Sequence, residues 1–404
     1  MNSLYDELAW RGFLNQHTFK DPKEINQPRT FYWGVDPSAD SMTIGNLAPA
    51  MMIRHFINHG HKAILLVGGA TGMIGDPDGK KQERDLKTLD EITKNKSAIA
   101  AQYKTIFAGQ DFEVVDNYDW FKNVNYLDFL RDVGKHAPMT QMLDREFVQN
   151  RIGEDGDGIS YAEFSYSLIQ GYDFLHLFRQ KGASLQVGGS DQWGNMISGV
   201  QLIRRIAGGE AHIWSTPLII NKQTGVKFGK SEDGAIWLDP KKTSPYKFYQ
   251  FWLNVDDETA EDLIKVYTLL PQAEVMSLIE QHREKPFERL LQKKLALEVT
   301  TIVHGQERAD SVVRATNLLF SKTEYDAITQ EDGDVLADEM PVVSGSQALT
   351  DILTQSNLAS SNAEAKRLIE AGSISVNGQK MITNEVIQAN SLLKKGKNSF
   401  VLIR

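Results

Sequence analysis

The stretch from Thr30 to Phe56 constrains the fold of this chain more than any other part of the sequence. It reads TFYWGVDPSADSMTIGNLAPAMMIRHF: an apolar run to Val35, a turn of small residues, and then a long helical pattern. In open α/β sheets, nucleotides bind where a strand ends in such a turn before a helix, because backbone N–H groups and the helix dipole meet the phosphates there. The pattern therefore predicts an α/β fold and a possible phosphate site, although many similar crossovers bind no ligand.

Two further apolar runs, 63–68 and 185–189, are also typical of buried strands. Continuous apolar strands separated by helical patterns indicate a parallel sheet that is covered on both faces. The interval between these two runs is too long for one crossover. We therefore expect an insertion at about 117–160, rich in aromatic and charged residues, which would make contacts within a dimer.

The remainder of the chain suggests further domains. After an α/β domain at 1–220, the helical patterns indicate a helical domain at 221–330. The acidic segment 331–344 has the composition of a linker. A small α+β domain would then occupy 345–404, with a basic helix at 363–369 and a strand from Ile374 into an Asn-Gly turn.

Composition excludes several classes of protein. The 404 residues include no cysteine, so disulfides, thiolate zinc sites and thiol nucleophiles are absent. No apolar run approaches the roughly 18 residues of a membrane span, and we expect a cytoplasmic protein without membrane contacts. The net charge of −9 argues against a nucleic-acid partner, but residues 345–404 carry seven basic against four acidic side chains.

A second possible phosphate site is the loop Lys227-Phe-Gly-Lys230-Ser231. Two lysines in a loop flanked by glycines would offer two mobile ammonium groups to a polyphosphate, and the glycines would let the loop close. A solvated turn would have the same composition.

A polar face on a mostly apolar helix indicates a binding site for a polar ligand. Tyr166, Gln170 and Asp173 lie at i, i+4 and i+7 and therefore share one side of that helix. Buried polar groups need partners, which either a ligand or an internal hydrogen-bond network can supply. The stretch 188–194, Gly-Gly-Ser-Asp-Gln-Trp-Gly, is a further strand-to-loop transition that bears an acid and an amide.

Two other patterns give weaker signals. The glycines of 68–76 do not form a GxGxxG fingerprint, so a dinucleotide site is not expected there, although Asp76 could face a charged ligand. His55 and His59 have the i, i+4 spacing of metal ligands, with His61 nearby. No acid or cysteine supports them, and we expect no protein metal site.

In combination, these motifs resemble a bacterial-type tyrosyl-tRNA synthetase, a class I aminoacyl-tRNA synthetase. DPSADSMTIGN stands in the position of the HIGH motif, followed in order by GATGMIGDP, FSYSLIQGYDF, QVGGSDQWGN and, in the position of KMSKS, KFGKS. The tail resembles a small RNA-binding fold shared with a ribosomal protein. The resemblance implies a Rossmann-like catalytic domain, an α-helical anticodon-binding domain and an α+β RNA-binding domain.

The resemblance also implies an activity. Such an enzyme couples tyrosine to ATP, with Mg²⁺ carried by the nucleotide, and then transfers the tyrosyl group to the 3′ end of tRNA(Tyr). The family acts as a homodimer.

Residue roles follow from matching the motifs. The catalytic residues would be Thr43, Asn46, Lys227, Lys230 and Ser231. ATP would contact Ser38, Gly45, Gly189, Asp191 and Lys230. The tyrosine pocket would comprise Tyr32, Asp36, Asp76, Tyr166, Gln170, Asp173 and Gln192. Contacts with tRNA phosphates would come from Lys366, Arg367, Lys394, Lys395 and Lys397.

This sequence departs from the family at three positions. Thr43 and Asn46 replace the two histidines of the HIGH motif, and threonine has a shorter reach and no cationic form. Trp33 is bulkier than the small residue expected beside the ribose. Two rival functions remain open: a tryptophan-specific synthetase on the same scaffold, and a catalytically idle relative that binds structured RNA.

Overall fold

The computed structural model describes residues 3–77, 87–153, 157–220, 228, 230–231, 234–320, 328–396 and 399–404. The chain divides into two compact units. The first comprises Met1–Asp239 and Val255–Leu291, and the second comprises Pro240–Asn254 and Gln292–Arg404.

The first unit is built on a five-stranded sheet in the order β3-β2-β1-β4-β5, and all four pairings are parallel. The strands are β1 Thr30–Val35, β2 Lys62–Val67, β3 Phe112–Asp116, β4 Ala183–Gly189 and β5 His212–Thr216. The predicted parallel sheet is therefore confirmed. The strand order reverses between β1 and β4, and in sheets of this type ligands bind outside the carboxyl ends of the strands at that point.

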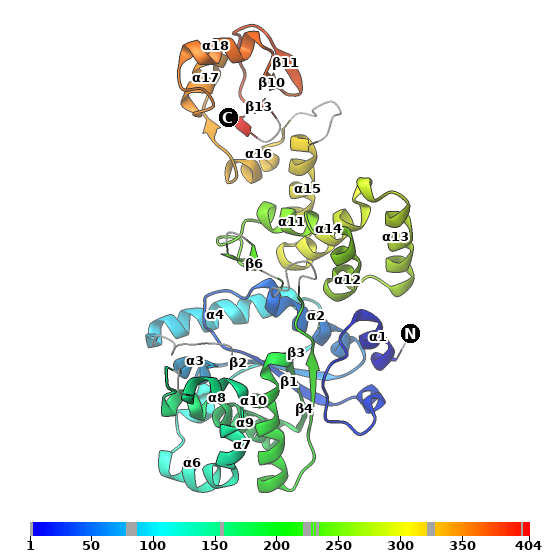
Figure 1. Ribbon diagram of the computed structural model, residues 1–404, viewed down its shortest axis with the longest axis vertical. Coiled ribbons are helices and arrows are strands. Elements are labelled where there is room, and N and C mark those ends of the chain that lie inside the picture. Colours follow the sequence, from blue (N-terminus) through cyan, green and yellow to red (C-terminus); the bar gives the residue numbers. More distant parts are fainter. Residues whose placement is uncertain are drawn as a thin grey trace. The chain divides into compact units, whose positions relative to one another are not determined.

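Helices cover both faces of this sheet (Figure 1). Helices α2 (Ile44–Asn58) and α4 (Leu89–Ile106) lie on one face, and α9 (Tyr161–Lys181) and α10 (Trp193–Leu202) lie on the other. The ends of α9 are set by its sequence: Ser160 accepts the N–H of Glu163, and Gly182 ends the helix with a φ of 66°. Outside the segment between β3 and α9, the described residues of this unit also form the α-helices α1 Leu4–Arg11, α3 Thr71–Ile74, α12 Asp257–Tyr267 and α13 Gln272–Glu284.

Four short α-helices and a 3₁₀ helix, Gly134–His136, lie within the described residues between β3 and α9, where an insertion was expected. The α-helices are α5 Tyr118–Phe121, α6 Tyr126–Asp132, α7 Met139–Leu143 and α8 Glu146–Ile152. A buried ion pair joins α8 to the first turn of α9, with 2.9 Å between the Arg151 guanidinium and the Glu163 carboxylate. Because leaving either charge unpaired would be costly, this pair fixes the end of the segment.

The second unit contains helices and a mixed sheet. The helices are α11 Pro245–Leu253, most of α14 Leu290–His304, α15 Gln306–Phe320, α16 Gln330–Ala337, α17 Leu349–Gln355 and α18 Asn362–Glu370. The sheet has the order β11-β10-β13-β14-β8, in which only β14 and β8 are parallel. Its strands are β8 Val342–Val343, β10 Ile374–Val376, β11 Gln379–Met381, β13 Ser391–Lys395 and β14 Ser399–Ile403. Short pairs also form between β9 Gln347–Ala348 and β12 Val386–Ile387 and, in the first unit, between β6 Lys230–Ser231 and β7 Gly234–Ala235.

The structure confirms the predicted elements of the tail. Helix α18 covers the basic stretch, and β10 leads into a turn at Asn377 and Gly378, whose φ values are 47° and 78°. Both residues of this turn need positive φ, which the Asn-Gly pair tolerates.

The predicted linker at 331–344 is wrong, because most of it belongs to regular structure. Helix α16 begins with a capping box between Thr329 and Asp332, and Arg314 pairs with the Asp332 carboxylate at 2.9 Å. Val335 and Leu336 are buried, so the acidic composition hid an amphipathic helix.

The predicted helical domain at 221–330 also differs from the observed division. Helices α12 and α13 belong to the first unit, whereas α11 and α15 belong to the second. Within the described residues, no helix is both long enough and apolar enough to cross a membrane.

Candidate functional site

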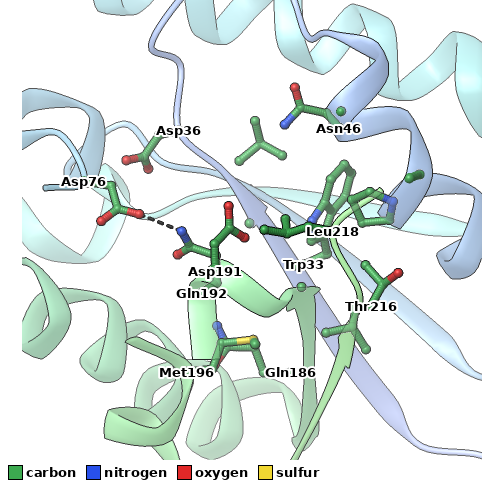
Figure 2. A pocket seen from close by; sticks show the side chains of 18 of the residues that line it. Trp33, Asp36, Asn46, Asp76, Gln186, Asp191, Gln192, Met196, Thr216 and Leu218 are labelled. Atoms are coloured by element: carbon green, nitrogen blue, oxygen red, sulfur yellow. Dashed lines mark hydrogen bonds between the residues drawn. The ribbon is translucent and has the colours of Figure 1, made fainter. Parts of the chain in front are cut away.

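A cavity of about 380 Å³ opens at the carboxyl ends of β1 and β4, where the strand order reverses (Figure 2). The residues predicted to bind tyrosine or ATP line this cavity, with the exception of Lys230. They are Tyr32, Ser38, Asp36, Gly45, Asp76, Tyr166, Gln170, Asp173, Gly189, Asp191 and Gln192, and the predicted catalytic residues Thr43 and Asn46 join them. The fold thus gathers in one place motifs that are far apart in the sequence.

The start of α2 forms one wall of the cavity. The Thr43 backbone N–H and hydroxyl both donate to the Asn46 Oδ1, at 3.0 and 3.2 Å. A Cβ on Gly45 would meet only the Thr43 Oγ1, at 3.4 Å, so the backbone here is open to a ligand. The helix N-terminus therefore turns its positive dipole end to the cavity, while the N–H groups of Ile44 and Asn46 already donate to the backbone oxygens of Ile236 and Thr43.

Acidic and amide groups gather at another end of the cavity, where Figure 2 shows Asp36, Asp76 and Gln192 close together. The Gln192 Nε2 donates to Asp76 at 2.7 Å. The Tyr166 hydroxyl donates to the Asp36 Oδ2 at 2.7 Å, and the Thr71 hydroxyl donates to the Oδ1 at 2.6 Å. Burial, followed by the charges of Asp36 and Asp76, raises the pKa of Tyr166 well above its usual value. This end of the cavity favours a cationic group.

Tyr32 and Asp173 form the deep part of the cavity. Tyr32 is 1% exposed, and its hydroxyl has no hydrogen-bond partner within the described residues. Burial raises the pKa of Asp173 to about 8, even though hydrogen bonds from Asn117 and Trp120 oppose that shift. A buried hydroxyl and a carboxyl group that is largely protonated at neutral pH suit a ligand with its own hydroxyl group.

The carboxyl end of β4 positions Asp191. A Cβ on Gly189 would lie 2.5 Å from the Asp191 Oδ1, so only glycine leaves room for this carboxylate. Trp33 on β1 is 3% exposed, lines the same cavity and packs against Tyr103 with ring centroids 5.5 Å apart. The bulk of Trp33 is therefore largely accommodated by the core between β1 and α4.

Residues that hold the binding groups in place were not predicted from the sequence. Asn117 donates to Asp173 at 3.1 Å and to Thr71 at 3.0 Å, and Trp120 Nε1 donates to the other Asp173 oxygen at 2.9 Å. Asn117 follows β3 directly, and a polar residue at the end of a parallel strand was the one signal that could have drawn attention to it.

The lysine loop is only partly described. Lys227 lies outside the described residues, and Lys230 and Ser231 are described as strand β6 without their side chains. The described lining of the cavity includes no Lys, Arg or His. Any cation that balances a bound polyphosphate must therefore come from other residues or from the ligand.

Of the three histidines near the end of α2, His61 is held by packing and a backbone hydrogen bond. His55, His59 and His61 do not form part of any group of three or more potential ligands among the described side chains. The Arg29 backbone N–H donates to the His61 Nδ1 at 3.3 Å. Burial lowers the pKa of His61 to about 4. His61 is therefore a neutral core residue.

The predicted tRNA contacts lie in the second unit. Lys366 and Arg367 are exposed on α18. On β13, the Lys394 and Lys395 ammonium groups donate to the backbone oxygens of Leu319 at 3.4 Å and Leu358 at 2.6 Å, so both lysines are half-buried. Lys397 falls outside the part of the chain that the structure describes.

Comparison with known proteins gives two family matches. Residues 23–321 match the model of class I tRNA synthetases for tryptophan and tyrosine, and residues 332–404 match that of the tyrosine–tRNA ligase C-terminal domain. A tyrosine–tRNA ligase from Bacteroides fragilis is 43% identical over 99% of both chains. Another from Limosilactobacillus fermentum is 41% identical over 100% of this chain and 97% of its own length.

Solved structures agree with these matches. A C-terminally truncated mitochondrial tyrosyl-tRNA synthetase from Aspergillus nidulans has a TM-score of 0.72 at 29% identity, over 79% of this chain and 95% of that chain. A tryptophanyl-tRNA synthetase from Encephalitozoon cuniculi has a TM-score of 0.54 at 14% identity, over 76% of this chain and 89% of that chain, and shares the fold alone. The C-terminal match and the full-length relatives separate the tyrosine family from its tryptophan counterpart. The chain therefore belongs to the tyrosine–tRNA ligases, class I aminoacyl-tRNA synthetases that activate tyrosine with ATP and load it onto tRNA.

Proposed function

We propose that the cavity at the ends of β1 and β4 binds tyrosine and ATP side by side, and that it forms tyrosyl-adenylate. The observation that carries this proposal is the convergence of five separate sequence motifs on one cavity at the reversal of strand order. The cavity offers an anionic end, a buried polar end and a helix N-terminus, which match the ammonium, the phenol and the phosphates.

Tyrosine would occupy the acidic and deep parts of the cavity. Its ammonium group would lie among Asp76, Tyr166 and Gln170, and its phenol between Tyr32 and Asp173. Phenylalanine would leave the buried polar groups unpaired, and such sites reject the analogue by about 10⁴–10⁵. Asp36 and Gln192 would complete this pocket.

ATP would occupy the opposite side, along the start of α2. Gly45 would let the adenine approach the backbone, Asp191 would hold the ribose beside Gly189, and Ser38 would contact a phosphate. The Thr43–Asn46 pair would contact the phosphates at the helix N-terminus, with the side-chain NH₂ group of Asn46 as the donor. Because the described lining lacks cations, Lys227, Lys230 and the Mg²⁺ that the nucleotide carries would stabilise the departing pyrophosphate, with Ser231 as an additional donor.

The reaction needs alignment rather than a general base. The tyrosine carboxylate attacks the α-phosphorus in line, a new O–P bond forms, and the bond to the β-phosphate oxygen breaks as pyrophosphate leaves. The terminal ribose hydroxyl of tRNA then displaces AMP and takes the tyrosyl group. Lys366, Arg367, Lys394, Lys395 and Lys397 would contact tRNA phosphates, which position the tRNA without specifying it.

We further propose that the protein is a homodimer in the cytoplasm, where it meets its tRNA. Several large apolar side chains between β3 and the start of α9 are exposed, which supports a protein contact. The exposed fractions are 71% for Leu127, 61% for Tyr161, 59% for Tyr126 and 56% for Met139. Light scattering after gel filtration should give twice the chain mass, and Leu127→Asp should lower it; a monomeric wild type would overturn the proposal.

Tyrosine-dependent exchange of pyrophosphate into ATP tests the proposed chemistry. Exchange with tyrosine and not with tryptophan is expected, since the deep pocket supplies partners for a hydroxyl group. Exchange with tryptophan alone would instead favour a tryptophan-specific synthetase. Absent exchange with retained tRNA binding would favour the idle RNA-binding relative.

A further inference from the structure

We infer that Arg145, in the segment between β3 and α9, is a positioning residue for the tyrosine-binding end of the cavity. It acts through Asn195, on α10, which contacts both Gln192 and Asp76. This inference rests on the proposed function of that cavity. No sequence motif includes Arg145, and its side chain is not part of the cavity lining.

Two guanidinium nitrogens of Arg145 make separate hydrogen bonds with residues of α10. Its Nη2 donates to the Gly194 backbone oxygen at 2.6 Å and to the Ser198 hydroxyl at 2.8 Å, which docks the segment on the helix. Its Nη1 donates to the Asn195 Oδ1 at 2.9 Å. Docking and the contact with Asn195 therefore use different atoms and can be separated by mutation.

The contact with Asn195 fixes which way its amide points. A guanidinium group has only donors, so the amide oxygen of Asn195 must face Arg145, and its NH₂ group must face the cavity. That NH₂ group lies 3.3 Å from the Gln192 Oε1 and 3.4 Å from the Asp76 Oδ1. Asn195 is 4% exposed, so water cannot readily replace these partners.

The orientation passes on to Gln192. Because the Gln192 oxygen accepts from Asn195, its own NH₂ group is directed at the Asp76 Oδ2, at 2.7 Å. Without Arg145, Asn195 loses the donor that holds its amide oxygen, and only its long bonds to Gln192 and Asp76, at 3.3 and 3.4 Å, are left to orient it. If Asn195 turns away, the Gln192 Oε1 and the Asp76 Oδ1 lose its NH₂ group, and the groups that meet the amino acid are less firmly held.

Arg145→Ala in the full-length protein tests this inference by tyrosine-dependent pyrophosphate exchange. We expect the tyrosine KM to rise about tenfold, as for the loss of a charge-assisted hydrogen bond, while the ATP KM stays within about twofold. Ser198→Ala is the matched control, since it removes a docking bond and leaves the Asn195 contact; its tyrosine KM should not change. Exchange that fails in the wild type would overturn the proposed function instead.

Two further measurements distinguish positioning from mere structural support. Asn195→Ala should reproduce the rise, and the double variant Arg145→Ala/Asn195→Ala should add little to either single change. A neighbouring cavity of about 180 Å³, which Arg145 itself lines, gives small solutes access to the vacated site. Millimolar guanidinium should therefore restore the tyrosine KM of Arg145→Ala and leave that of Asn195→Ala unchanged.

The opposite results would overturn the inference. These are a normal tyrosine KM in Arg145→Ala, an equal rise in the ATP KM, or additive effects in the double variant. Arg131→Ala offers a second control on the same segment, because Arg131 is 62% exposed and pairs with Asp132 at the surface.

Discussion

The Tyr32 hydroxyl is buried without a hydrogen-bond partner within the described residues, in the cavity where both oxygens of the Asp173 carboxyl group are already held by Asn117 and Trp120. The geometry of the Asp173 carboxyl group is thus set before any ligand arrives. The Tyr32 hydroxyl, in contrast, lacks the partner that a phenol would supply. Binding tyrosine therefore avoids the free-energy penalty of an unpaired buried hydroxyl, which binding phenylalanine would retain.

Tyr32→Phe is accordingly expected to narrow the preference for tyrosine over phenylalanine by roughly tenfold, because it removes one buried group that phenylalanine leaves unpaired. Asp173→Ala should abolish more of the preference, since it also releases Asn117 and Trp120. The measurement is the ratio of kcat/KM for the two amino acids in pyrophosphate exchange. Unchanged selectivity in Asp173→Ala would remove that residue from the hydroxyl site.

The raised pKa of Asp173 predicts a pH-dependent stability. Burial raises this pKa from 3.8 to about 8, so between those values the folded protein keeps a proton that the unfolded chain releases. The contribution of Asp173 to stability therefore falls as the pH rises through this window, with a slope of at most about 1.4 kcal/mol per pH unit. The Tm of the wild type relative to Asp173→Asn should decline from about pH 5 to about pH 8. A constant difference would show that Asp173 does not titrate there.

His61 predicts the opposite dependence. Burial lowers the pKa of its imidazole from 6.5 to about 4, so below its usual pKa the unfolded chain takes up a proton that the folded protein refuses. Stability from His61 is present above about pH 6.5 and is lost as the pH falls toward about 4. His61→Asn keeps an acceptor for the Arg29 N–H and cannot titrate, so it should flatten the acid limb of the Tm profile. Parallel profiles for the two proteins would contradict this account.

The sequence was sufficient for the central strands because most of their residues are buried. β1, β2 and β4 are nearly continuous apolar runs, whereas β3 is an edge strand whose Glu113 and Val114 are exposed. β5 is fully buried yet contains Ser215, whose hydroxyl donates to the Gln16 backbone oxygen at 3.0 Å. Neither strand has the pattern that identifies a buried parallel strand, and the partner of Ser215 lies about 200 residues away.

Contacts between distant parts of the chain also limited what could be predicted of the cavity. Its lining could be predicted because each motif is local and ends at a strand or helix terminus. The residues that orient the lining could not, since Asn117, Trp120 and Arg145 reach it from one segment whose path depends on tertiary packing. Composition likewise misled at 331–344, where the Asp332 carboxylate caps α16 and pairs with Arg314.

Lys230→Ala is expected to lower adenylate formation by about 10²–10³ while tyrosine still binds, because the ammonium group would act on charge that develops only in the transition state. Stopped-flow formation of the adenylate, together with equilibrium binding of tyrosine, separates the two effects. Lys247→Ala, in the second unit, is a matched control: this lysine is exposed and pairs with Glu339 at 3.8 Å. Near-normal exchange in Lys230→Ala would remove the loop from the mechanism.

Thr43 offers a test of the altered helix start. Its hydroxyl and N–H both bond the Asn46 Oδ1, so this short side chain is committed to the turn and its hydroxyl oxygen reaches little of the cavity. Thr43→His keeps the N–H bond and adds an imidazole that can extend to the phosphates. One charge-assisted hydrogen bond in the transition state corresponds to a rise in kcat of roughly tenfold, with the tyrosine KM unchanged.

Thr43→Val is the control for that change, because it loses the hydroxyl bond and gains no donor. We expect it to lower the free energy of unfolding by about 1 kcal/mol, as for other lost helix caps, without raising kcat. If Thr43→His leaves the rate of exchange at or below that of the wild type, threonine at this position does not limit the reaction. The phosphates would then be held by the Asn46 amide, the positive end of the α2 dipole and the lysine loop, and a histidine at position 43 would add nothing to the reaction in this chain.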